Sequence, residues 1–190
     1  HHTLPSMGVF LKTIVTNDLA EKVAASYGLE TINTLTGFKF IGEQLSILEA
    51  QGQENRFIFA FEESYGYLSG TYARDKDGVL AAFLIAEMFS FYHNHGITLT
   101  QRLEQIYKAF GFCLNTQHSY SSPGASGMEK MDSIMSSFRS NPPRLLADQH
   151  VEKVEDYSAG IGGLPKSNVL KYYTQYSSVV IRPSGTEPKL

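Results

Sequence analysis

The chain has 190 residues, of which 42% are apolar and 18% are charged, and it carries 12 Phe and 11 Tyr. This composition excludes a disordered chain and predicts a globular protein with one domain or two small ones. A net charge of −3 excludes the broad basic surface of a non-specific nucleic-acid binder, and a single cysteine excludes a disulfide framework and a cysteine-rich zinc site.

The first residues resemble an expression remnant. His1 and His2 indicate a purification tag, so residues 1–8 are assigned to tag and linker. No apolar stretch reaches the ~20 residues of a membrane span, and no signal peptide is visible. We therefore expect a cytoplasmic protein without membrane or nucleic-acid partners.

Residues 9–118 are predicted to alternate between strands and helices. The apolar periodicity predicts strands at 10–15, 30–34 and 56–61, and helices at 19–27, 41–49, 79–93 and 98–110. Helix 79–93 is apolar on nearly all sides and is expected at the centre of the domain. Thr98 and Gln101 have the spacing of a capping box. This alternation predicts an α/β domain with a mixed, mostly parallel sheet and flanking helices.

Residues 119–190 are expected to form a smaller α+β domain. The stretch 119–127 is rich in Ser, Gly and Pro and predicts a linker or exposed loop. Met128, Met131 and Met135 follow at helical spacing, which predicts a helix with a buried methionine stripe. Two strands are expected after it, at 149–157 and 177–182.

The first candidate site follows strand 56–61, which is nearly all apolar and is predicted to be buried on both faces. Glu62, Glu63, Ser64 and Gly66 lie just beyond it, where open α/β sheets bind ligands. Carboxylates accept strong hydrogen bonds from sugar hydroxyls, and a glycine lets the backbone approach a ligand. The pattern favours a polyol site. The alternative is that the acids cap the next helix or are solvated.

A charged run, Arg-Asp-Lys-Asp-Gly, occupies residues 74–78. Lys76 could meet a phosphate as a point charge, and Asp77 could cap the following helix. The alternative is a solvated charge cluster at a helix start, which contributes little.

The second candidate site follows the last predicted strand. Arg182 can bind phosphate with two parallel hydrogen bonds, Ser184 and Thr186 offer hydroxyls, and Gly185 permits a tight bend whose N–H groups surround an anion. The glycine spacing of the phosphate loop of nucleoside triphosphatases is absent, so a nucleoside triphosphatase is not indicated. The pattern favours a phosphate loop over an ordinary turn.

Together these motifs resemble the α-D-phosphohexomutases, the family of phosphoglucomutases and phosphomannomutases. The sequence Phe-Glu-Glu-Ser-Tyr-Gly at 61–66 resembles the sugar-binding loop of the third family domain. The sequence Arg-Pro-Ser-Gly-Thr-Glu-Pro-Lys at 182–189 resembles the phosphate-binding loop of the fourth domain. The runs at 36–39 and 74–78 also fit, in the right order. The amino-acid sequence of the stretch 62–87 is most similar to that of the bacterial α-phosphoglucomutases.

The resemblance implies interconversion of glucose 1-phosphate and glucose 6-phosphate through a bisphosphorylated sugar and an enzyme phosphoserine. The full-length enzyme would need Mg²⁺ and glucose 1,6-bisphosphate. The family's serine loop and aspartate-rich metal loop are absent from this sequence. We therefore expect no catalytic residue and no metal ligand here. Residues 9–118 would be the third domain, and 119–190 a C-terminally truncated fourth domain.

The resemblance also implies roles for individual residues. Glu62 and Ser64 would bind sugar hydroxyls. Phosphate would be bound by Lys76 and by four residues of the last loop, Arg182, Ser184, Gly185 and Thr186. Lys39 and Glu63 are possible further contacts.

The expected partners are a hexose phosphate and the missing N-terminal domains of the same protein. The alternatives are a phosphomannomutase or phosphopentomutase of the same family, or a stand-alone module that binds sugar phosphates.

Overall fold

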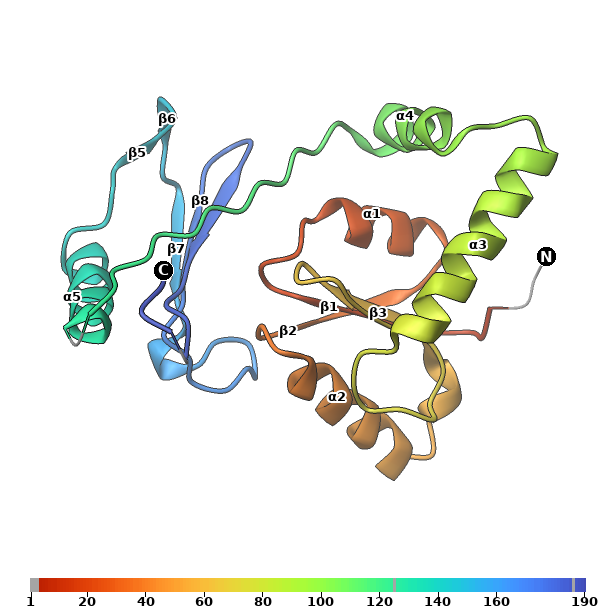
Figure 1. Cartoon of the computed structure of the whole chain (residues 1–190), viewed down its shortest axis with the longest axis horizontal. Helices are drawn as coiled ribbons and strands as arrows, with labels where there is room; N and C mark the ends of the chain where they lie inside the picture. Colours follow the sequence, from red (N-terminus) through yellow and green to blue (C-terminus); the bar gives the residue numbers. More distant parts are fainter. Residues whose placement is uncertain (1–3, 125, 186) are drawn as a thin grey trace. The chain divides into compact units, whose positions relative to one another are not determined.

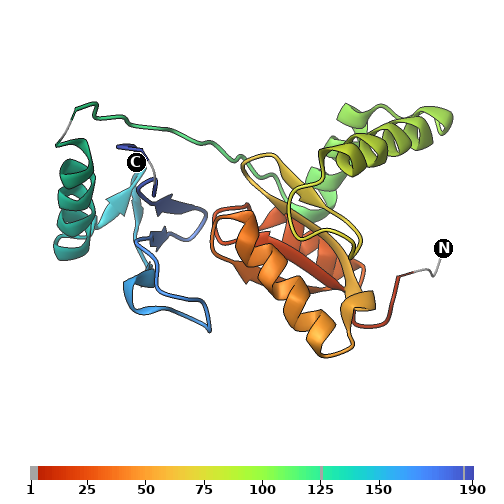
Figure 2. The same ribbon diagram turned by 60° about the horizontal axis from the view of Figure 1, so that its bottom comes forward.

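The protein is described by a computed structural model that covers residues 4–124, 126–185 and 187–190. The chain divides into two compact units, His1–Asn115 and Thr116–Leu190. Figures 1 and 2 show the elements of each unit in two views.

The first unit is built on a four-stranded sheet with the strand order β2-β1-β3-β4. Its strands are β1 (Val9–Thr13), β2 (Glu30–Thr34), β3 (Phe57–Glu62) and β4 (Gly66–Leu68). β1 is parallel to β2 and β3, whereas β4 is antiparallel to β3. Helix α1 (Leu19–Ser26) covers one face and α2 (Phe38–Ala50) the other (Figure 1). A short 3₁₀ turn, η1 (Glu54–Arg56), leads into β3. The predicted α/β class is confirmed.

The main core lies between α2 and the sheet. Val9 and Leu11 of β1 are fully buried together with Ile41 and Leu45 of α2. Helix α2 begins after Gly37, whose φ of +117° lies in the region that favours glycine. The chain can therefore turn sharply from the carboxyl end of β2 into the helix that covers the sheet.

The prediction that residues 56–61 are buried on both faces is wrong. Phe57 and Ala60 are buried in the core against α2, whereas Phe59 and Phe61 are only half-buried. Successive strand residues point to opposite faces, and an irregularity in the register between β1 and β3 at Val9/Phe10 places Phe57 and Ala60 on the same face. The opposite face is covered less completely, because α1 has only 8 residues.

The long apolar helix is not central. Helix α3 (Gly78–Asn94) has no buried residue, and the exposed fractions of Val79, Phe83 and Phe89 are 85%, 64% and 56%. An apolar sequence favours burial without specifying a partner surface. Only Leu80, Ala81, Leu84 and Tyr92 of this helix are half-buried. The helix expected at 79–93 therefore forms, but the expectation that it is buried at the centre of the domain is wrong.

Helix α4 (Leu99–Phe110) begins with the predicted capping box. The Gln101 N–H donates to the Thr98 hydroxyl at 3.1 Å, and the Thr98 N–H donates to the Gln101 side-chain oxygen at 2.8 Å. The N–H groups at a helix start have no acceptor within the helix, so each of these two side chains supplies an acceptor to the backbone of the other residue.

The second unit combines one helix with antiparallel strands. Helix α5 (Gly127–Ser140) is followed by the hairpin β5 (Leu145–Leu146) and β6 (Gln149–His150). A three-stranded sheet then follows in the order β7-β8-β9. Its elements are β7 (Lys153–Asp156), η2 (Tyr157–Ala159), β8 (Leu170–Tyr173) and β9 (Ser178–Ile181).

The core of this second unit joins α5 to the central strand. Met135, Leu170 and Tyr172 are fully buried against one another. Met131 is also buried, whereas Met128 is 43% exposed. The methionine stripe is thus core at two of its three positions. The single strand expected at 149–157 is divided between β6 and β7, and β8 was not expected.

Within the residues that the structure describes, no helix combines the length and the apolar character needed to cross a membrane.

Candidate functional site

The site of the first unit lies where three parallel strands end at the same edge of the sheet. Thr13, Thr34 and Glu62 are the last residues of β1, β2 and β3. All three are buried. The loops that follow these strands therefore meet at the position where open α/β sheets bind ligands.

Glu62 is a buried carboxylate with one oxygen paired and one unpaired. Its side chain is 3% exposed, and Oε1 lies 2.5 Å from the Lys76 ammonium. Oε2 is buried and has no hydrogen-bond partner among the described residues. A buried acceptor without a partner costs free energy, so this oxygen is suited to accept a hydrogen bond from a bound hydroxyl.

Gly66 makes this arrangement possible. A Cβ at Gly66 would lie 2.8 Å from Lys76 Cε and 2.9 Å from both Glu62 Cγ and Phe38 Cδ2. No side chain fits there without moving these neighbours. The glycine therefore lets the loop after β3, the start of α2 and the charged run converge on one point.

Glu63 and Ser64 have different surroundings from Glu62. Glu63 Oε2 accepts hydrogen bonds from the hydroxyls of Thr13 at 2.7 Å and Thr16 at 3.4 Å, so Glu63 ties the loop to the end of β1. Ser64 is exposed, and its carbonyl accepts a hydrogen bond of 3.4 Å from Lys76 Nζ. Tyr65, at the loop tip, is 87% exposed and has a φ of +58°. The structure thus brings Glu62, Ser64 and Lys76 together, whereas the Glu63 side chain binds the two threonine hydroxyls near the end of β1.

Lys39 stands on the first turn of α2, near the same edge. It is exposed, and its ammonium lies 4.8 Å from the centre of the Phe40 ring. Its contact is thus with its own helix. Among the residues that the structure describes, the buried hydroxyl of Thr36 has no hydrogen-bond partner, as is also true of Glu62 Oε2.

The rest of the charged run is structural. Arg74 pairs with Glu49 of α2 at 2.5 Å. Asp77 caps α3 by accepting from the Leu80 N–H at 2.8 Å, as predicted. This hydrogen bond, together with one from Tyr72, lowers the pKa of Asp77. Lys76 is therefore the residue of this run that faces Glu62.

The candidate phosphate loop belongs to the second unit. Arg182 directly follows β9 and is half-buried. The Ser184 N–H donates to the Lys189 carbonyl at 2.8 Å, and the Ser184 hydroxyl accepts from the Glu187 N–H at 3.3 Å. A Cβ at Gly185 would meet nothing within 4 Å, so a side chain at this position would not clash. Thr186 lies outside the described residues.

The same loop is fastened to the start of the unit. Tyr120 and Leu190 exchange two backbone hydrogen bonds of 2.9 and 3.0 Å, and the Ser122 N–H donates to the Pro188 carbonyl at 3.0 Å. A Cβ at Gly127 would lie 2.1 Å from the Ser122 carbonyl oxygen, so Gly127 is required where α5 begins. The hydrogen bonds to Pro188 and Leu190 attach the carboxyl end of the loop to residues 120–122.

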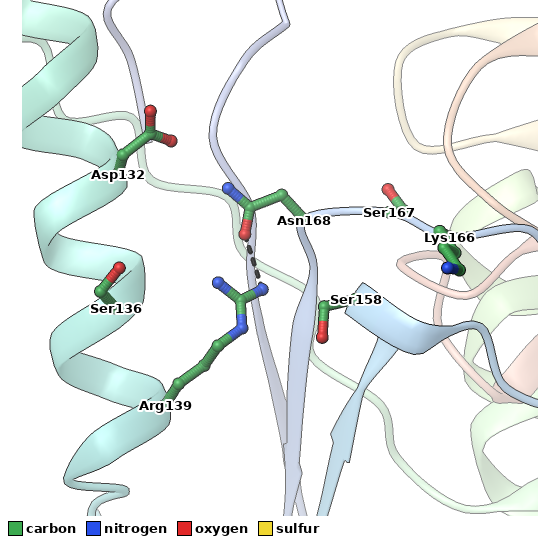
Figure 3. A pocket seen from close by; sticks show the side chains of 7 residues that line it. All are labelled: Asp132, Ser136, Arg139, Ser158, Lys166, Ser167 and Asn168. Atoms are coloured by element: carbon green, nitrogen blue, oxygen red, sulfur yellow. Dashed lines mark hydrogen bonds between the residues drawn. The ribbon is translucent and has the colours of Figure 1, made fainter.

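A separate hollow of about 440 Å³ lies beside α5 (Figure 3). Arg139 extends into it and donates to Asn168 Oδ1 at 2.6 Å and to Asp156 at 3.0 Å. Lys166 and Asp132 also line it. None of the predicted site residues that the structure describes lines this hollow.

Comparisons with known proteins agree with the resemblance seen in the motifs. The family model for phosphoglucomutase/phosphomannomutase, alpha/beta/alpha domain III, matches residues 1–110. The chain belongs to the phosphoglucomutase/phosphomannomutase family. A phosphoglucomutase from Staphylococcus aureus (strain MSSA476) is 37% identical over 193 residues, covering 96% of this chain and 34% of the relative. One from Staphylococcus saprophyticus is 35% identical, over 95% and 34%.

A solved structure shows the same fold. The open form of parafusin, a phosphoglucomutase from Paramecium, matches with a TM-score of 0.63 at 22% identity, covering 95% of this chain and 31% of that one. This chain spans about a third of the length of the family members it matches.

Two features of this family member's site were missed from the sequence. The Thr13 and Thr16 hydroxyls hold Glu63, and buried Lys12 pairs with Glu21 at 2.9 Å and Asp18 at 3.4 Å beneath the same edge. A lysine inside an otherwise apolar strand was the available signal, since lysine is almost never fully buried without a partner.

The family resemblance implies a magnesium ion, which the described residues do not fit. Across 4–124, 126–185 and 187–190, no three His, Cys, Asp or Glu side chains come together as a metal would require. Mg²⁺ is held by carboxylates in octahedral geometry. No step of the chemistry is therefore assigned to a metal held by these residues.

Proposed function

We propose that this chain is the substrate-recognition part of a phosphohexomutase. The full-length enzyme would interconvert glucose 1-phosphate and glucose 6-phosphate through a bisphosphorylated sugar and an enzyme phosphoserine. The observation that carries this proposal is the buried, half-paired carboxylate of Glu62 at the carboxyl edge of the sheet. Membership of the family and the order of the two loops support it.

Each residue has a role in binding rather than in bond breaking. The free oxygen of Glu62 accepts a hydrogen bond from a sugar hydroxyl, and the exposed Ser64 hydroxyl makes a second one. Lys76, 42% exposed beside Glu62, balances the charge of a phosphate. Lys39 and Glu63 are supporting residues, the latter because it already binds Thr13.

Arg182 binds the phosphate that is not transferred, aided by Ser184, Gly185 and Thr186. Its planar guanidinium matches two phosphate oxygens. A loop of this kind suits either end of a sugar bisphosphate, because the phosphate geometry is the same at both ends. The phosphoserine, the Mg²⁺ ion and glucose 1,6-bisphosphate belong to the full-length enzyme. That enzyme is an isomerase whose expected compartment is the cytoplasm.

Titration of the ¹⁵N-labelled chain tests the recognition role. Adding glucose 1-phosphate is expected to shift the amide signals of residues 62–66 and of 182–185, whereas inorganic phosphate alone shifts only the second group. Glu62→Gln should remove the first response and leave the second. The proposal is wrong if several millimolar glucose 1-phosphate shifts neither group.

A second test concerns whether this chain only binds the substrate or also catalyses the reaction. The purified chain, supplied with Mg²⁺ and glucose 1,6-bisphosphate, is expected to convert no glucose 1-phosphate. Robust mutase activity would contradict a recognition role. A stronger response to mannose 1-phosphate or ribose 1-phosphate than to glucose 1-phosphate would overturn the glucose assignment and favour the other branches of the family.

A further inference from the structure

Helix α3 presents an exposed apolar surface that several large side chains form. Val79, Phe83, Ile85, Phe89 and Phe91 are all more than half exposed. Between Gly78 and Asn94, Glu87 is the only acidic residue, and neither lysine nor arginine occurs. Apolar patches of this kind mark interaction surfaces, and a helix that is apolar on all sides is normally buried.

The helix is not a loose segment, because both ends of the α3–α4 stretch are attached to its own unit. At the start, the Asp77 N–H donates to the Tyr67 carbonyl of β4 at 2.9 Å. At the far end, Lys22 of α1 donates to the Phe110 carbonyl at 3.2 Å. Figures 1 and 2 show α3 beside the sheet, away from the two faces that α1 and α2 cover. The exposed side of α3 is thus held open to solvent.

One side of α3 has a pattern that is symmetric about Ala86. Helical spacing places residues three, four and seven apart on the same side. Counting outward from Ala86 in both directions, Phe83 corresponds to Phe89, Ala82 to Ser90, and Val79 to His93. All seven residues are exposed. Large groups thus match large groups, and small groups match small ones.

We propose that two copies of this chain associate through α3, packed antiparallel with Ala86 on the two-fold axis. Phe83 of each copy then contacts Phe89 of the other, and the small residues at the crossing let the helices approach to about 8–10 Å. The surface is self-complementary, as a two-fold interface requires. Its lack of lysine and arginine argues against a partner chosen by charge.

The size of the surface is adequate for a dimer. A buried phenylalanine removes about 150–250 Å² from water, and two such residues from each copy lie in the stripe. With Val79 and the alanines, each copy contributes several hundred Å². Specific interfaces bury about 800 Å² per partner, and weaker ones less than about 600 Å². A dimer of moderate affinity is therefore expected.

Sedimentation of the full 190-residue chain tests this proposal. The mass should rise from one to two chains with increasing concentration. Ala86→Glu sets two carboxylates against each other on the axis and should weaken dimerisation by at least about 100-fold. Tyr176→Asp, at a residue that is 77% exposed in the other unit, is the control and should leave the dimer unchanged. A chain that stays monomeric at every concentration would overturn the proposal.

Cross-linking tests the register and does not depend on whether Ala86→Glu folds. In a Cys113→Ser background, which removes the only cysteine, Ala86→Cys should form an intermolecular disulfide on oxidation. Helices this close bring the two Cα atoms within disulfide range. Met88→Cys lies on the other side of the helix and should not cross-link. Equal cross-linking at both positions would show non-specific association and contradict the antiparallel pair.

Discussion

Lys76 and Glu62 form an ion pair of 2.5 Å in which the two partners differ sharply in exposure. The lysine side chain is 42% exposed and the glutamate 3%. Water can solvate the ammonium without its partner, but the carboxylate depends on the lysine. The pair therefore links the charged run before α3 to the buried end of β3.

This asymmetry predicts unequal costs of mutation. Lys76→Met leaves a buried carboxylate without a counter-charge and should destabilise the chain by about 2–4 kcal/mol. Glu62→Gln leaves a solvated lysine and should cost about 1 kcal/mol. Urea denaturation measures both. Equal costs would contradict the buried character of Glu62, and the double variant should cost less than the sum.

Gly66→Ala should destabilise the first unit. The added Cβ would meet Lys76, Glu62 and Phe38 at less than 3 Å, and overpacking of this kind costs about 1–3 kcal/mol. Gly78→Ala is the matched control, since a Cβ at Gly78 meets nothing within 4 Å and lies at the start of a helix. Thermal unfolding should separate the two variants. A Gly66→Ala chain as stable as the parent would show that this loop can relax.

Arg182→Ala should weaken the binding of glucose 1-phosphate. A hydrogen-bonded charged group contributes about 1.5–3 kcal/mol, which corresponds to a loss of roughly 10- to 150-fold in affinity. Arg144→Ala, at an exposed arginine of the same unit, is the control. Calorimetric titration measures both, and equal affinities would refute the assignment of the phosphate loop.

The stability of the second unit should fall in acid. Burial alone would raise the pKa of Asp156, but the Ser158 N–H and Arg139 outweigh it and lower that pKa. For Glu155 the same effect of burial is outweighed by hydrogen bonds from Lys153, Tyr173 and Tyr157, so its pKa is also lowered. A carboxyl whose pKa is lowered by folding stabilises the fold at higher pH and loses this contribution as pH falls through that pKa.

The melting temperature should accordingly drop below about pH 4. Asp156→Asn should lower it at neutral pH and flatten its dependence on pH. Asp132→Asn, at an exposed carboxyl on α5, should leave the acid slope unchanged. If Asp156→Asn left the dependence of the melting temperature on pH unchanged, the ion pair between Asp156 and Arg139 would not contribute to stability.

Much of the local structure could be predicted from the sequence, because local signals act within a few residues. The capping box at Thr98, the cap at Asp77 and the parallel strands of the first unit all follow from spacing and residue type. Strand β8 was missed, since Leu-Lys-Tyr-Tyr is short and partly polar. It is buried only because α5 and its neighbouring strands cover it.

For this protein, the sequence alone determined the family resemblance, the two candidate loops and the positions of the first strands and helices. The functional roles of those loops stay predictions. Only the tertiary structure decided that α3 is exposed, that Glu62 has one free oxygen, and that Glu63 binds Thr13 and Thr16. The reason is physical. The hydrophobicity and charge of a side chain determine which kinds of contact stabilise it, whereas the residues that provide those contacts are distant in sequence.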